Sequence, residues 1–180
     1  MKYIRRLILH ILSRLFIISI IIGIFIITFY YAMNASSIYI IVKEGMEKRA
    51  QVIMYSDDVQ SLNKYFLPAY IQNDKSLQLK LNGQSPYSWY KIRGIDHRIE
   101  LKWLWAWPWD NVANVEFIER IPLIDGNVLP KYREIVLAQG NEKALYPPKW
   151  RSGKYTAVLV QENGKWLIKS ITQNNDWEGN

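Results

Sequence analysis

The sequence predicts an α+β membrane protein, with an N-terminal transmembrane helix, then helices packed on a curved antiparallel sheet. Three observations support this prediction. An uncharged run of 19 residues lies near the N-terminus of the 180-residue chain. Apolar residues then recur at helical spacing, and beyond Pro86 the pattern changes to the alternation of apolar and polar residues that is typical of strands.

The uncharged run is LFIISIIIGIFIITFYYAM, residues 15–33, which is long enough to cross a bilayer as a helix. Lys and Arg residues precede it without any Asp or Glu, so the positive-inside rule predicts a cytoplasmic N-terminus. The run is longer than the apolar region of a cleavable signal peptide. We therefore expect a single-pass protein of the cell membrane, with a cytoplasmic tail (1–14), a transmembrane helix (15–33) and an extracytoplasmic α+β domain (34–180).

The charge and the lack of cysteine exclude several classes of function for the outer domain. Four of the 23 Lys and Arg residues precede residue 34, which leaves 19 basic against 16 acidic residues outside, a net charge of +3. No basic tract with interleaved aromatic residues is present, so we predict no direct nucleic-acid binding. Zero cysteines exclude disulfides and thiol chemistry.

The first segment outside the membrane has the pattern of an amphipathic helix. Between Ala35 and Met54 the apolar residues Ile38, Val42, Met46, Ala50 and Ile53 recur at helical intervals. No proline occurs between residues 15 and 54, so this helix and the anchor should form one continuous rod. A second helix should begin at the cap residue Asp58, and Pro68 should bend or divide it.

The remaining segments are expected to be turns and strands. Residues 73–86 are polar and turn-rich, and strands are predicted at 95–109, 112–126 and 154–172. Asn163-Gly164 predicts a two-residue hairpin turn. Its register would pair Glu162 with Lys165, Val160 with Leu167, and Val158 with Lys169. Residues 125–149 form a long connection, whose segment YREIVLAQG fits either a short strand or a helical turn.

Four tryptophans occupy alternate positions in KWLWAWPWD, residues 102–110. On a strand these indoles share one face. We expect Trp103 and Trp105 to lie in the core, and Trp107 and Trp109 to be partly exposed at the sheet's rim, where they would dock a protein partner. The candidate interaction residues are therefore Trp107 and Trp109, together with Trp105 next to the core.

The sequence offers little support for catalysis. His97 is the one histidine of the predicted outer domain, and its neighbour Asp96 would point to the opposite face of a strand. We expect His97 to be a packed imidazole between Ile95 and Ile99. The sequence predicts no catalytic residues, no cofactor and no metal site.

The order of elements resembles the cone-shaped fold of nuclear transport factor 2. More narrowly, it is similar to the membrane-anchored assembly factors of type IV secretion and conjugation systems. The matching features are the anchor with its amphipathic helix, the segment Asp58 to Tyr70, and the hairpin from Tyr155 to Ile171 with Trp166 beyond its turn. The resemblance implies a non-catalytic scaffold of an envelope complex, which contacts other envelope proteins. Independently of the resemblance, we expect the outer domain to self-associate only weakly, because its net charge is +3 and an anchor that concentrates chains in two dimensions lets modest interfaces suffice. The alternative is a binding module for a cell-wall glycan or a hydrophobic ligand.

Overall fold

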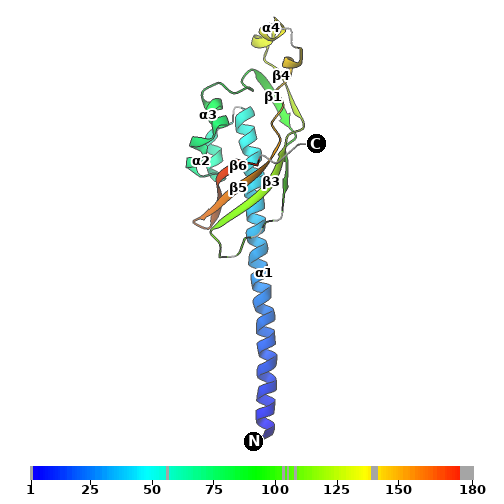
Figure 1. Cartoon of the computed structure of the whole chain (residues 1–180), viewed down its shortest axis with the longest axis vertical. Helices are drawn as coiled ribbons and strands as arrows, with labels where there is room; N and C mark the ends of the chain where they lie inside the picture. Colours follow the sequence, from blue (N-terminus) through cyan, green and yellow to red (C-terminus); the bar gives the residue numbers. More distant parts are fainter. Residues whose placement is uncertain are drawn as a thin grey trace.

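The structure is a computed structural model that describes residues 2–55, 57–102, 104, 106–107, 109–138 and 142–174 (Figure 1). Its elements, in chain order, are α1 (Lys2–Met54), η1 (Val59–Lys64), α2 (Pro68–Asn73), α3 (Lys75–Leu81), β1 (Tyr90–Ile95), β2 (Arg98–Leu101), β3 (Val112–Arg120), β4 (Ile124–Val128), α4 (Pro130–Ala138), η2 (Glu142–Leu145), β5 (Gly153–Glu162) and β6 (Lys165–Gln173). The long helix α1 and the antiparallel sheets together confirm that the protein is of the mixed α+β class.

Helix α1 is continuous over 53 residues, which confirms the predicted rod. Its first half stands alone below the domain in Figure 1, with exposed apolar side chains, and it is long and apolar enough to cross a membrane. The second half enters the domain, where Ile38, Val42, Met46 and Ile53 are buried. The same helix therefore supplies both the apolar segment and one wall of the core.

The segment after α1 is divided at Pro68, as predicted. Asp58 caps η1 by accepting a hydrogen bond from the Gln60 backbone nitrogen at 2.9 Å, and Pro68 opens α2. The expectation of turns throughout 73–86 is wrong, because α3 lies there. Asp74 caps it by accepting from the backbone nitrogens of Ser76 and Leu77. Polar residues of this kind suit both a turn and a helix cap, so composition alone did not separate the two.

Two antiparallel sheets follow the helices. The larger has the order β2-β3-β5-β6 and curves around α1, and the smaller pairs β1 with β4. Inward-facing residues of β3 and β5, such as Val115, Phe117 and Leu159, complete the core with α1. The strand expected at 95–109 is wrong in length, because β1 ends at Ile95 and β2 spans only Arg98–Leu101.

The β5–β6 hairpin has the predicted turn, with φ of 51° at Asn163 and 74° at Gly164. Its first pairs also match, but Val158 pairs with Ser170 and not with Lys169, because a bulge interrupts the register. The bulge leaves Lys169 as the extra residue and brings Ile171 opposite Ala157. Without this shift the polar Ser170, and not Ile171, would face the core.

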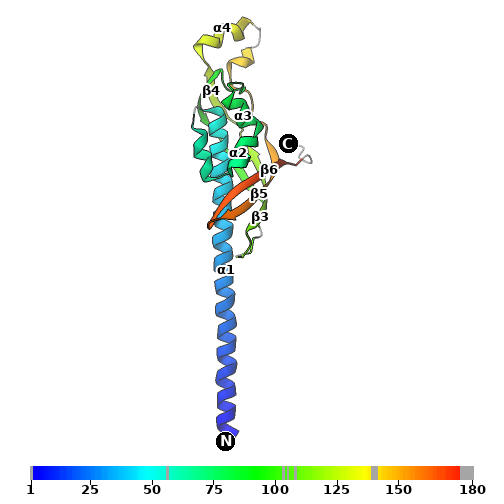
Figure 2. The same cartoon turned by 90° about the vertical axis from the view of Figure 1, so that its left-hand side faces the viewer.

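The connection at 125–149 contains the helix that the sequence left undecided. Residues 130–138 form α4, and η2 follows it. With the β1–β4 ribbon they make a small distal lobe, which we define as residues 90–95, 124–138 and 142–146. Figures 1 and 2 both show this lobe beyond the C-terminal end of α1, at the far end of the molecule from the N-terminus.

Helix α1 lies close to its neighbours at Gly45, where an added Cβ would lie 3.1 Å from the Tyr65 Cβ and 3.2 Å from the Ile168 Cδ1. We expect Gly45→Val to lower the free energy of unfolding by about 1–3 kcal/mol, because the core there is already filled. Gly23→Val is the matched control, since nothing lies within 4 Å of that position. Chemical unfolding of the full chain in detergent, followed by tryptophan fluorescence, measures both. Equal losses for the two variants would contradict the close approach.

Candidate functional site

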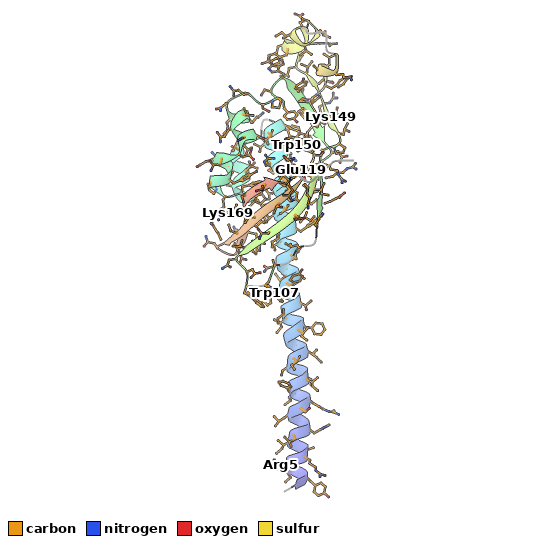
Figure 3. All side chains as sticks on the ribbon, in the orientation of Figure 1. Arg5, Trp107, Glu119, Lys149, Trp150 and Lys169 are labelled. Carbon is orange, nitrogen blue, oxygen red and sulfur yellow. The ribbon has the colours of Figure 1, made fainter. Side chains whose placement is uncertain are left out.

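A cleft of about 1170 Å³ opens between the helices and the end of the large sheet. Its described lining comes from α1, α2, α3, residues 85–87, residues 149–151, Tyr155 of β5 and the last part of β6. In Figure 3, Lys149 and Trp150 lie above Lys169, and all three residues line the cleft. The cleft therefore collects residues that are far apart in the sequence.

The floor of the cleft contains a buried ion pair between Arg49 of α1 and Asp74. Arg49 Nε donates to Asp74 Oδ2 at 2.7 Å, and the Tyr70 hydroxyl donates to the same oxygen at 2.7 Å. The other carboxylate oxygen accepts the capping bonds of α3. Asp74 thus joins α1, α2 and α3 through one side chain.

The ion pair shifts the pKa values of its members in opposite directions. Burial disfavours the charged form of Asp74, but Arg49 and the hydrogen bonds outweigh it and hold the pKa of this carboxyl below its ordinary value. Burial likewise disfavours the Arg49 guanidinium, while Tyr70 and Asp74 raise its pKa above the usual value. Both groups are therefore charged in the folded protein at neutral pH.

A second polar cluster centres on Glu119, which faces inward on β3. Its Oε1 lies 3.0 Å from His97 Nε2, and its Oε2 accepts a hydrogen bond from Trp150 Nε1 at 3.2 Å. Only 1% of the Glu119 side chain and 3% of the His97 side chain are exposed. The burial of His97 was predicted, whereas its carboxylate partner was not, and Asp96 instead pairs with Arg98.

A signal for the Glu119 cluster is present in the sequence. The inward positions of β3 are Ala113, Val115, Phe117 and Glu119, so one charged residue falls on an apolar face. A charge at such a position needs a buried partner. Neither Glu119 nor His97 is among the described residues that line the cleft, so this pair fastens β3 to its neighbours and does not face a substrate there.

The walls of the cleft are aromatic and its mouth is basic. Tyr70, Tyr87, Trp150 and Tyr155 line it, and burial raises the pKa of the Tyr87 hydroxyl to about 12. Of the charged residues in the described lining, five are basic and only Asp74 is acidic. Since Asp74 is paired with Arg49, the four remaining basic residues give the cleft a positive field. They are Lys75, Lys149, Arg151 and Lys169.

Trp107 lies beside α1 at the opposite end of the domain, at its lower edge in Figure 3. Trp107 and Trp109 are 38% and 65% exposed, as expected for the rim of the sheet, and their rings stack with centroids 5.1 Å apart. The positions expected for Trp103 and Trp105 lie outside the described residues. The assignment of Trp105, Trp107 and Trp109 to partner docking stays a prediction.

Comparisons of the chain with protein-family models, with curated proteins and with solved structures found no match. The function is therefore inferred from the geometry of the molecule.

Replacing the carboxylate of the ion pair tests how much the cleft floor contributes to stability. Asp74→Asn should lower the free energy of unfolding at pH 7 by about 3–5 kcal/mol, because Arg49 loses its counter-charge. The pKa of Asp74 is lower in the folded chain than its ordinary value of 3.8. The ionised carboxylate therefore contributes its full stability above pH 3.8, and this stability is lost as the pH falls through the lower pKa of the folded chain. The difference in unfolding free energy between Asp74→Asn and the unmodified chain should thus become smaller in acid.

Urea unfolding of the full chain between pH 2 and pH 7 measures this difference. Asp96→Asn is the control, because it removes the carboxylate of an exposed pair with Arg98 and should change stability little. A loss from Asp74→Asn that stays constant across this range would show that the charge of the carboxylate contributes nothing.

Proposed function

We propose that the protein is a single-pass membrane protein whose outer domain acts as a non-catalytic scaffold of a cell-envelope complex. The observation that carries this proposal is the continuity of α1, which joins the apolar segment at 15–33 to the core of the domain without a linker. The basic residues before that segment favour a cytoplasmic N-terminus and an extracytoplasmic domain. Such a helix holds the domain at a constant height above the membrane, which suits a structural component better than a freely diffusing enzyme.

The distal lobe supplies a surface for a protein partner. Ile135, Leu137 and Tyr146 are exposed there, on α4 and just after η2. Residues 34–54 of α1 span about 30 Å at 1.5 Å per residue, so the lobe lies at least that far from the bilayer. Apolar side chains at this height cannot reach lipid, and an envelope protein on the outer side of the membrane is the occupant that fits them.

The resemblance to type IV secretion assembly factors narrows the proposal to a conjugative transfer channel. The curved four-stranded sheet around the second half of α1 supports a cone of the nuclear transport factor 2 type. Weak self-association of the outer domain belongs to the same proposal, because an anchor concentrates chains in two dimensions and small interfaces then suffice.

Leu137→Ser tests the docking role of the distal lobe. We expect this variant to recover fewer envelope proteins when the full chain is purified from membranes of its source cell. Each 1.4 kcal/mol of lost binding free energy weakens the association roughly tenfold. Leu81→Ser is the matched control, since Leu81 is 57% exposed and Leu137 46% exposed, and each lies near the end of a short helix. Equal recovery of partners with both variants would contradict docking through this lobe.

The cleft favours a second function, the binding of an anionic cell-wall glycan or amphiphile. The specific observation is that four aromatic residues line the walls of the cleft together with four basic residues, whose charges the described lining does not neutralise. Aromatic rings stack on the apolar faces of sugars or acyl chains, and the basic mouth attracts the negative group.

Lys169→Glu should weaken the binding of anionic glycans to the full chain in detergent, and added salt should reduce the difference by screening. Lys165→Glu is the matched control, because both lysines are exposed on β6 but only Lys169 lines the cleft. Titration calorimetry measures the affinities. If both variants bind as the unmodified chain does, the cleft is not a glycan site.

A further inference from the structure

We propose that Trp107 and Trp109 bind lipid in the outer headgroup layer, so that the domain touches the membrane at a second point besides its span. The inference rests on the proposed transmembrane role of α1, and it assigns the two indoles to the bilayer rather than to a protein partner.

Two hydrogen bonds place Leu104 and Trp107 at the outer end of the span. The Tyr31 hydroxyl donates to the Leu104 carbonyl at 2.7 Å, and Asn34 Nδ2 donates to the Trp107 carbonyl at 3.2 Å. Asn34 directly follows the apolar run that ends at Met33. Figure 3 shows Trp107 next to α1 at the lower edge of the domain, where the helix leaves it.

The height of this segment matches the thickness of the headgroup layer. Residues 31 and 34 are separated by about 5 Å along the helix axis. A bilayer of 40–45 Å with a 30 Å hydrocarbon core leaves roughly 5–8 Å for the polar layer on each side. A loop that is bonded to α1 between these two residues therefore lies within or at the border of that layer.

The side chains have the chemistry of a membrane interface. Indole combines a large apolar ring with one N–H donor, and tryptophan and tyrosine are enriched where lipid meets water. Trp109 is 65% exposed and stacks on Trp107, so the pair presents a joint apolar surface outside the core. The exposed Tyr30 and Phe29 lie edge to face on α1 at the same level and extend the aromatic belt.

The loop is held in place, so the indoles have a defined depth. The Trp107 backbone nitrogen donates to Asp110 Oδ2 at 2.9 Å, and the Asp110 backbone nitrogen donates to the Trp107 carbonyl at 3.0 Å. Together with Tyr31 and Asn34, this turn fixes the segment to the helix. A protein partner would have to displace headgroups to reach the indoles, whereas lipid is present wherever α1 spans a membrane.

Quenching by brominated lipids tests the contact in the full chain, in vesicles that contain no other protein. Lipids with bromine near the headgroup should quench the emission of the unmodified chain more strongly than that of a Trp107→Phe, Trp109→Phe double variant. Trp89→Phe is the control, because Trp89 is also exposed but lies in the link to the distal lobe, stacked on Tyr132. That variant should be quenched like the unmodified chain. Equal quenching of the double variant and the unmodified chain would overturn the proposal.

A second measurement keeps both indoles and uses the absence of cysteine from the chain. A nitroxide on Asn111→Cys, directly after the loop, should be accessible to oxygen and partly shielded from a water-soluble nickel complex. A nitroxide on Tyr146→Cys in the distal lobe should be fully accessible to the nickel complex. If the Asn111 label is as accessible to the nickel complex as the Tyr146 label, and the indoles are not quenched, then Trp107 and Trp109 lie in water, as residues of a protein-docking surface would.

A nitroxide on Ile22→Cys separates failure of the lipid contact from failure of the span. With the Ile22 label shielded in hydrocarbon, unquenched indoles overturn the lipid contact alone. With the Ile22 label in water, α1 does not cross the bilayer, and both proposals are overturned together.

Discussion

The structure depends on one helix that changes character without a break. From residue 15 to residue 33 the sequence of α1 is apolar on every side, and from Ile38 onward apolar residues form a single stripe that faces the sheet. No glycine or proline stands at the boundary near Asn34. A helix is stiff over this length. The position of the apolar stripe around the helix axis therefore fixes which side of α1 the sheet covers, relative to the membrane-spanning half of the same helix.

The domain fastens its other elements to this helix partly through buried charge. Asp74 accepts bonds from α1, α2 and the first turn of α3, and Glu119 joins β3 to His97 and to Trp150. Breaking a buried pair is costly, and an incomplete polar network is worse than an apolar one. Such networks therefore favour a single arrangement of the short helices, and they leave a polar floor under the cleft.

Local patterns in the sequence predicted the features that depend on neighbouring residues. The uninterrupted rod, the cap at Asp58 and the turn at Asn163 all followed from short-range chemistry. The bulge opposite Val158 did not, because it is decided by the need to bury Ile171 across the sheet. The partnership of Glu119 with His97 likewise required the register of β2 on β3, which places Glu119 opposite Ile99. Only the inward position of Glu119 indicated it. The cleft left no local pattern, because its lining comes from segments that are far apart in the sequence.

The two proposed roles of the molecule are mechanically connected. A lone transmembrane helix tilts by about 20° on average, and at 30 Å above the bilayer this angle moves a point sideways by roughly 10 Å. A lipid contact at Trp107 and Trp109, on one side of the helix exit, opposes tilting because the indoles would have to leave the interface or enter the hydrocarbon. The distal lobe would then present Leu137 at a nearly constant position above the membrane. A scaffold gains affinity from that restriction, since less freedom is lost when the next component binds.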